Sequence, residues 1–269
     1  MVGNIYALAK RLECQPSDII DMSSNVNPLG PPPGLAEFLT DNLDAIVALP
    51  EADAHSAIFA FAQRYGLDPE CVVAGNGTTQ LIYAIPKAIG SRNVVIVAPT
   101  YSDYADACKM HDIPYRYSLL TDSRNFEPDF DTLEQDIRDA DTVFICNPNN
   151  PTGVLMASNQ LEAFCKAFPD KTFIIDESYL PFVADAEQHS FLGRDIGNVI
   201  VLHSMSKIFR VPGLRIGFAS ASPAITRKLI RYTLPWSLNS LAQAAVVWLM
   251  TRVSEIDEFV GKIKELFGK

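Results

Sequence analysis

Lys207 and Arg215 are the residues whose types and spacing point most directly to chemistry. Lys207 follows an apolar run and two serines, Ser204 and Ser206, and Arg215 comes shortly afterwards. A lysine beside a sheet edge loses water, which lowers the pKa of its amine and makes it a nucleophile that forms imines. Serine hydroxyls donate to a phosphate, and arginine binds one through paired hydrogen bonds. A lone lysine is more often a solvated surface residue, but these neighbours favour a reactive one.

An acid, a phenol and an amide follow two other apolar runs. Asp176 directly follows the predicted strand Thr172–Ile175, at the edge where open α/β sheets bind ligands. A carboxylate there can keep a pyridine nitrogen protonated, which makes the ring an electron sink, and Tyr179 can reach the phenolic oxygen of the same ring. Asn150, in a turn with two prolines and a glycine, is a rigid donor to a ring oxygen. The alternatives are a helix N-cap for Asp176 and an ordinary Asn-Pro turn for Asn150.

Two further positions complete the candidate site. Gly77 and Thr78 follow a short strand-like run and open a helix, whose free N–H groups suit an anion. Gln80 stands where a dinucleotide fingerprint needs its third glycine, so the pattern fits a single phosphate instead. Tyr101 can stack on a flat heteroaromatic ring, although it is also compatible with a core or surface tyrosine. The amine, acid, amide, phenol and guanidinium together are the set needed to hold pyridoxal phosphate as an imine.

Short β-branched runs alternate with longer helical patterns along the chain. The predicted strands are 71–74, 93–98, 142–146, 172–175, 199–203 and 215–220, and the predicted helices are 78–89, 101–110, 131–140, 157–168 and 223–232. This alternation predicts βαβ units on a mainly parallel sheet with helices on both faces, a three-layer α/β/α sandwich. Residues 24–34 are too rich in proline and glycine for a helix and are expected to be extended.

Composition limits the classes of function. The chain has 269 residues, 48% of them hydrophobic, and a net charge of −10, which argues against a nucleic-acid partner but not against a small phosphorylated substrate. Its five scattered cysteines predict neither disulfides nor a zinc site, and its four histidines have no metal-ligand spacing. No signal peptide or membrane-length apolar run occurs, so we expect a cytoplasmic protein.

These motifs closely resemble those of the fold-type I pyridoxal-phosphate enzymes, in the branch of histidinol-phosphate aminotransferase and threonine-phosphate decarboxylase. The resemblance runs from about Gly3 to Asn239, and its Asn-Pro-Thr-Gly, Asp-x-x-Tyr, Ser-x-x-Lys and Lys-to-Arg spacings are highly specific. It implies pyridoxal 5'-phosphate as the cofactor and a homodimer in which residues 24–34 reach across to the partner.

The resemblance also implies a role for each candidate residue. Lys207, Asp176 and Tyr179 would be catalytic, with Lys207 as the imine-forming lysine and Asp176 paired with the pyridinium nitrogen. The other implied contacts are Asn150 and Tyr179 with the ring 3-oxygen, Tyr101 stacked on the ring, and Gly77, Thr78, Ser204, Ser206 and Arg215 around the phosphate.

Within that branch, several stretches look more like the decarboxylase. They are Gly3–Tyr6, Ser23–Gly30, Pro212–Arg215 and Pro235–Asn239. The resemblance then implies a lyase that converts threonine phosphate to aminopropanol phosphate for cobalamin side-chain assembly. The alternatives are a histidinol-phosphate aminotransferase-like transaminase and a truncated, non-catalytic relative that binds the cofactor.

The sequence departs from the family pattern at three places. Leu49 stands before Pro50 where many relatives have a tyrosine that reaches the partner's cofactor phosphate, and Met1-Val2 replaces an expected His-Gly pair. The chain also ends where the family continues into a small C-terminal domain that carries the arginine for the substrate carboxylate. The resemblance thus implies a fragment or a truncated gene product whose small domain is missing.

We therefore expect three segments. These are an N-terminal arm (1–34), a cofactor-binding large domain (35–236) and the start of a helix that leads to the absent domain (237–269). This last helix is expected to run off the end of the chain without a cap and to expose apolar side chains such as Val246, Val247 and Leu249.

Overall fold

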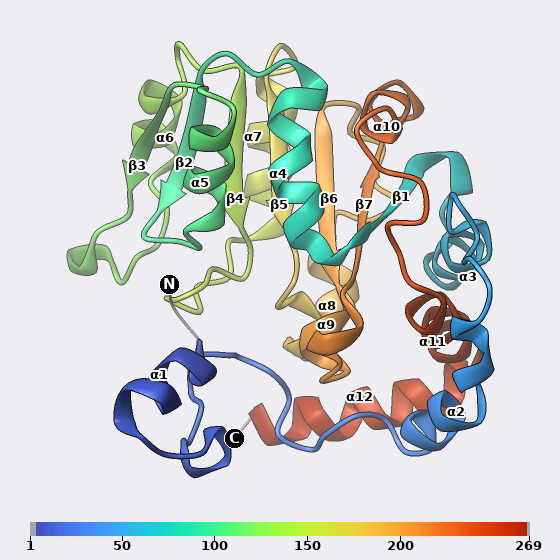
Figure 1. Cartoon of the computed structure of the whole chain (residues 1–269). Helices are drawn as coiled ribbons and strands as arrows, with labels where there is room; N and C mark the ends of the chain where they lie inside the picture. Colours follow the sequence, from blue (N-terminus) through green and yellow to red (C-terminus); the bar gives the residue numbers. More distant parts are fainter. Residues whose placement is uncertain (1–3, 268–269) are drawn as a thin grey trace.

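A seven-stranded sheet forms the centre of the protein over residues 4–267, which are the residues that the computed structural model describes (Figure 1). The strand order is β1-β7-β6-β5-β4-β2-β3. The strands are β1 (Val72–Asn76), β2 (Val94–Ala98), β3 (Tyr115–Leu119), β4 (Thr142–Cys146), β5 (Thr172–Asp176), β6 (Val199–Ser204) and β7 (Ile216–Ala221).

The sheet is mainly parallel, as the sequence predicted. Only β7 runs antiparallel to its neighbours, β1 and β6, whereas the other neighbouring pairs are parallel. The segment Met205–Arg215 between β6 and β7 holds only two single turns of helix, which is too short for a parallel crossover. As a result, the amino end of β7 lies at the same edge of the sheet as the carboxyl ends of the parallel strands.

Helices cover both faces of the sheet and confirm the three-layer sandwich (Figure 1). Apolar residues of α4, α5 and α10 pack on one face, and those of α6 and α7 pack on the other. The helices are α1 (Ile5–Leu12), α2 (Leu35–Asp41), α3 (His55–Tyr65), α4 (Gly77–Ile89), α5 (Asp103–Met110), α6 (Phe130–Asp136), α7 (Ser158–Ala167), α8 (Ala186–His189), α9 (Met205–Ile208), α10 (Pro223–Ile230), α11 (Ser240–Thr251) and α12 (Val253–Phe267).

The sequence patterns missed one strand and several helices. The edge strand β3 has only one buried residue, Ser118, so it carries no apolar run that would have revealed it. Helix α3 buries three alanines and Phe61, and alanine is a weak marker of a buried face. Residues 24–34 contain no helix or strand, as expected.

The prediction for the C-terminal segment was wrong in two respects. Residues 240–267 form two helices instead of one, because α11 ends at Thr251 and α12 begins at Val253; the Asn239 side chain accepts from the Ala242 N–H and caps the start of α11. Val246 and Leu249 are fully buried and Val247 is half-buried. They belong to an apolar cluster with α2, α3 and β7, so the body of the protein itself covers this helix.

Over residues 4–267, no helix is long and apolar enough to cross a membrane. Within the same range, no three His, Cys, Asp or Glu side chains cluster as metal ligands. The departure at Met1-Val2 and the first residue of the Gly3–Tyr6 motif lie outside the described residues.

Candidate active site

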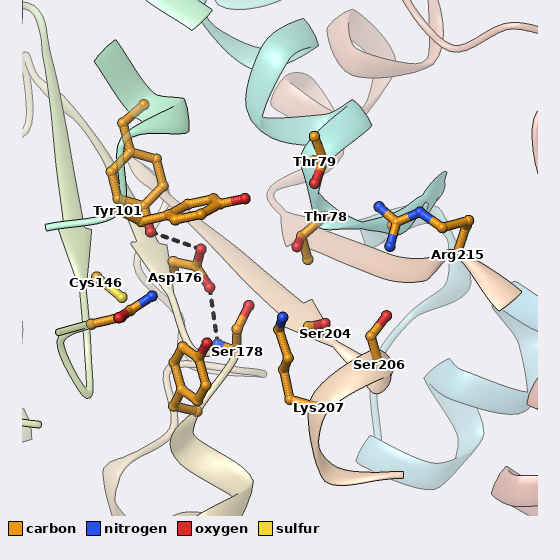
Figure 2. A pocket seen from close by; sticks show the side chains of 14 residues that line it. Thr78, Thr79, Tyr101, Cys146, Asp176, Ser178, Ser204, Ser206, Lys207 and Arg215 are labelled. Atoms are coloured by element: carbon orange, nitrogen blue, oxygen red, sulfur yellow. Dashed lines mark hydrogen bonds between the residues drawn. The ribbon is translucent and has the colours of Figure 1, made fainter. Parts of the chain in front are cut away.

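A single pocket at the carboxyl edge of the sheet brings together all ten residues predicted from the sequence (Figure 2). Four residues that were not predicted, Thr79, Tyr104, Cys146 and Ser178, also line it. The full lining is Gly77, Thr78, Thr79, Tyr101, Tyr104, Cys146, Asn150, Asp176, Ser178, Tyr179, Ser204, Ser206, Lys207 and Arg215.

The strand order determines the order of side chains across the pocket. Strand β1 leads into Gly77 and Thr78, and the neighbouring β7 follows Arg215. The next three strands, β6, β5 and β4, lead to Lys207, Asp176 and Asn150 in turn, and the loop after β2 supplies Tyr101. In Figure 2, the Lys207 amine therefore points between Asp176 on one side and Thr78 and Arg215 on the other.

One end of the pocket is built for an anion. Gly77 has a positive φ of 73°, and a Cβ there would overlap the Arg215 guanidinium. A Cβ on Gly217 would overlap the backbone N of Thr78. Glycine at both positions lets the N-terminus of α4 approach β7 and Arg215, so that free N–H groups and a guanidinium face one space.

Arg215 has no carboxylate partner at that end among residues 4–267. Its Nη1 donates to the Pro212 carbonyl at 3.2 Å, and it forms no ion pair with any carboxylate of residues 4–267. The buried hydroxyls of Ser204 and Ser206 also line this end. The donors there are thus left for an anionic ligand.

The other end of the pocket carries a buried acid. Asp176 is only 4% exposed, and its two oxygens accept from the Tyr104 hydroxyl at 2.8 Å and from the Ser178 N–H at 2.9 Å. Burial raises the pKa of Asp176, against the opposing effects of these hydrogen bonds and of the Lys207 charge. A cationic ring nitrogen placed beside Asp176 would reverse this shift, because an opposite charge favours the carboxylate.

Tyr104 is a site residue that the sequence patterns missed. It is fully buried and stacks on Phe144 with 4.9 Å between ring centroids. Its position was readable in principle, since it lies three residues after Tyr101 within the helix predicted over residues 101–110. What the sequence did not reveal is that its hydroxyl points at Asp176, because that contact joins α5 to β5.

Lys207 lies half-buried on α9, a single helical turn. Burial lowers the pKa of its amine, the Arg215 charge lowers it further, and Asp176 opposes both. A lower pKa increases the fraction of free amine at neutral pH, which is the form that attacks a carbonyl.

The Asn-Pro-Asn-Asn-Pro turn divides its three amides between structure and site. Asn147 binds the backbone of Met156, and Asn149 binds Thr100, Thr152 and the Pro99 carbonyl. Only Asn150 lines the pocket. Tyr179 and Tyr101 line it as well, and burial raises the pKa of both phenols, so both are neutral at pH 7.

The comparisons with known proteins now define the class of this protein. The family model of class I and II aminotransferases matches residues 17–268, so the chain belongs to that family. This membership confirms the predicted family and pyridoxal 5'-phosphate as the cofactor.

Individual relatives come from both arms of the predicted branch. The chain is 34% identical over 244 residues to a bifunctional adenosylcobalamin biosynthesis protein of Leptospira interrogans, covering 89% of this chain and 28% of that protein. It is 32% identical to threonine-phosphate decarboxylase of Salmonella typhimurium, covering 90% of this chain and 68% of that protein. The crystal structure of histidinol-phosphate aminotransferase from Clostridium acetobutylicum superposes with a TM-score of 0.81 at 27% identity, covering 90% of this chain and 72% of that one.

Behind the pocket, Glu177 anchors the loop that follows β5. Its carboxylate is 1% exposed and accepts from the Ser190 hydroxyl at 2.7 Å and from the Phe191 N–H. Burial raises the pKa of Glu177 from 4.5 to about 7, although these hydrogen bonds and Arg194 act to lower it. The folded protein therefore binds a proton that the unfolded chain releases above pH 4.5.

We predict that Glu177→Gln removes a pH-dependent loss of stability. A raised folded-state pKa contributes stability that is fully present below the unfolded value of 4.5 and is lost as pH rises through about 7. Glutamine carries no charge, so the unfolding free energy of the wild type minus that of the variant should fall across this window. Each pKa unit corresponds to about 1.4 kcal/mol. Urea denaturation of the cofactor-free proteins between about pH 5 and pH 8 measures the difference.

Glu187→Gln is the matched control, because the Glu187 side chain is exposed in the neighbouring helix α8. A flat difference for Glu177→Gln, or the same slope for both variants, would contradict the assignment.

Proposed function

We propose that this protein is a pyridoxal-phosphate-dependent enzyme in which Lys207 binds the cofactor covalently. The observation that carries the proposal is the placement of the Lys207 amine between the buried Asp176 and the anion site at Arg215 (Figure 2). A flat cofactor with a phosphate at one end and a ring nitrogen further along matches this order of groups.

The residues fit the cofactor's groups one by one. The phosphate is held by Arg215, the α4 N-terminus at Gly77 and Thr78, and the two serine hydroxyls. Asp176 pairs with the ring nitrogen and keeps it protonated, and Tyr104 and Ser178 hold the carboxylate in place. The remaining contacts are the amide of Asn150 and the phenol of Tyr179 with the ring 3-oxygen, and the ring of Tyr101 against the ring face.

The chain's own residues then bind, orient and move protons. When bound, pyridoxal phosphate withdraws electrons from the α-carbon of an amino substrate. Lys207 would hold the cofactor and, once free, would serve as the base for the α-carbon proton, a role that its lowered pKa suits. Asp176 would hold the ring nitrogen as an ion pair, and Arg215 would hold the phosphate.

We further propose threonine-phosphate decarboxylase-like chemistry on a small phosphorylated amino acid. Two of the relatives described above support this choice, since one is a threonine-phosphate decarboxylase and the other a bifunctional protein of adenosylcobalamin biosynthesis. Transamination of histidinol phosphate is the alternative, supported by the aminotransferase of similar fold. In either reaction Lys207 handles the proton at the α-carbon.

We predict that borohydride fixes the cofactor onto Lys207. Reconstituted protein should absorb in the visible as a protonated imine, and reduction followed by peptide mapping should recover the label on the peptide that contains Lys207. Lys207→Ala should lose the band, whereas the exposed Lys228→Ala should keep it. A label on another lysine, or no band after reconstitution, would overturn the proposed attachment.

A second prediction concerns reaction type and Asp176. The protein as its organism produces it should release carbon dioxide from O-phosphothreonine, and Asp176→Asn should lower turnover by about a hundredfold or more, because a neutral amide no longer holds the ring nitrogen protonated. Carbon dioxide and amine product are measured for both proteins.

Formation of an oxo product from histidinol phosphate when a 2-oxo acid is supplied as amino acceptor, without carbon dioxide release from O-phosphothreonine, would favour the aminotransferase. No turnover of either substrate by a protein that still binds the cofactor would point to a non-catalytic relative. Near-normal turnover by Asp176→Asn would mean that the acid is not a cofactor partner.

We also propose that the protein is a homodimer. Apolar side chains with high exposure support an interface: Ile20 and Met22 are 88% and 86% exposed, and Val47 and Leu49 are 85% and 76% exposed. Large exposed apolar patches mark interaction sites, and these residues fall in two pairs close in sequence. Leu49 is the residue that replaces the family's cross-subunit tyrosine, so any contact it makes with a partner is apolar.

We predict a dimeric mass by light scattering, shifted towards monomer by Val47→Asp because a buried, unpaired charge opposes association. Val253→Asp, at a 43% exposed position in α12, serves as the control and should leave the mass unchanged. A wild-type monomer that retains tightly bound cofactor would contradict the dimer.

A further inference from the structure

Asn27 is fully buried although it lies in the proline-rich entry segment, far from Lys207 in the sequence. Its backbone N–H donates to the Lys207 carbonyl at 3.2 Å, and its Nδ2 donates to the carbonyl of the next residue, Ile208. In return, Arg210 Nη1 donates to the carbonyls of Asn27 and Pro28 at 3.2 and 3.0 Å. We call these four hydrogen bonds between residues 27–28 and 207–210 the clasp.

The clasp acts on an element with little stability of its own. Helix α9 is one turn long, from Met205 to Ile208, and a single turn is not stable in isolation. The last carbonyls of a helix lack partners within the helix. Asn27 supplies donors to two carbonyls at this end, that of Ile208 and that of Lys207, which also accepts from the Arg210 N–H at 3.3 Å. The chain then turns through Arg210 in a left-handed conformation, with φ of 48°, and this turn presents its side chain back to Asn27.

Burying the polar side chain of Asn27 costs free energy that an apolar side chain filling the same space would not. Its Oδ1 is buried and receives no hydrogen bond from residues 4–267, and an unsatisfied buried acceptor typically costs about 1–3 kcal/mol. An apolar side chain of similar size would avoid that cost. What the asparagine adds is the Nδ2 donor, and that donor is directed at the turn that carries the lysine.

We infer that Asn27 is a positioning residue that holds the Lys207 turn, so that the amine points into the pocket before the cofactor arrives and returns to one place after each release. This inference rests on the proposed attachment of the cofactor at Lys207. Asn27 does not line the pocket and acts only through the backbone of residues 207 and 208. It should therefore affect covalent attachment more than the binding of the phosphate, because Arg215, Gly77, Thr78 and Ser204 lie outside the clasped turn.

The test compares Asn27→Ala with Asn198→Ala. The Asn198 amide also bridges backbone carbonyls, those of Cys165, Phe168 and Lys171, but it lies before β6, at the opposite end of that strand from the pocket. In cofactor-free protein, hydrogen exchange of the peptide spanning residues 205–211 should be about tenfold faster in Asn27→Ala, as expected for the loss of one buried hydrogen bond. Asn198→Ala should leave exchange in this peptide unchanged.

Covalent attachment provides the second measurement. The visible band should form about tenfold more slowly in Asn27→Ala than in the wild type, and at the wild-type rate in Asn198→Ala. In a Lys207→Ala background, adding Asn27→Ala should weaken the dissociation constant of pyridoxal phosphate by clearly less than the about tenfold loss in attachment rate, because Ser206 is the one proposed phosphate ligand on the clasped turn. If Asn27→Ala does not fold, Arg210→Met breaks the two hydrogen bonds that Arg210 contributes to the clasp and should produce the same two effects.

Unchanged exchange and attachment in Asn27→Ala would overturn the inference. Equal changes in Asn198→Ala would do the same, as would a dissociation constant in the Lys207→Ala background that weakens as much as attachment slows. If the wild type fails to attach the cofactor at Lys207, the proposed function fails. Hydrogen exchange still decides whether the clasp holds the turn, because that measurement needs no cofactor.

Discussion

The close approach of β7 to the start of α4 is the constraint on which the candidate site depends. Gly217 lies against the backbone of Thr78, and Gly77 lies against the Arg215 guanidinium, so a side chain at either glycine would force the two elements apart. That separation would remove the α4 N–H groups from the arginine and break the anion site. The antiparallel direction of β7 matters equally, because it brings the amino end of that strand, and Arg215 with it, to the edge where the parallel strands end.

Charge is separated across the pocket by the order of the strands. Arg215 directly precedes β7, which pairs with β1. Asp176 is the last residue of β5, and Lys207 follows β6, the strand between β5 and β7. The amine therefore lies between a fixed cation and a buried acid, and burial outweighs the acid in setting its pKa. Burial raises the pKa of Asp176 in the free protein. The same burial makes a cationic ring nitrogen a favourable partner for its carboxylate.

Local sequence was sufficient for the features that local geometry determines. The buried strands were recognisable as continuous apolar runs, and polar residues just after them fall at the carboxyl edge because strand ends align in a parallel sheet. Features that depend on distant contacts were missed. The Tyr104 hydroxyl of α5 contacts Asp176 of β5, and the burial of Val246 and Leu249 depends on packing against α3. The edge strand β3 was missed because an edge needs no apolar run.

Alternation along β5 continues into the turn that follows it and connects the pocket to the far side of the sheet. Asp176 faces the pocket, whereas the next side chain, Glu177, points away and binds the Ser190 hydroxyl and the Phe191 N–H. The Glu177 N–H also donates to the Leu202 carbonyl of β6, two residues before Ser204. The turn that presents Asp176, Ser178 and Tyr179 is thus held by the buried carboxyl group of Glu177.

The turn that carries Lys207, after the neighbouring strand β6, is held by Asn27. The turns that carry Asp176 and Lys207 are thus each held by a buried polar group that does not itself line the pocket.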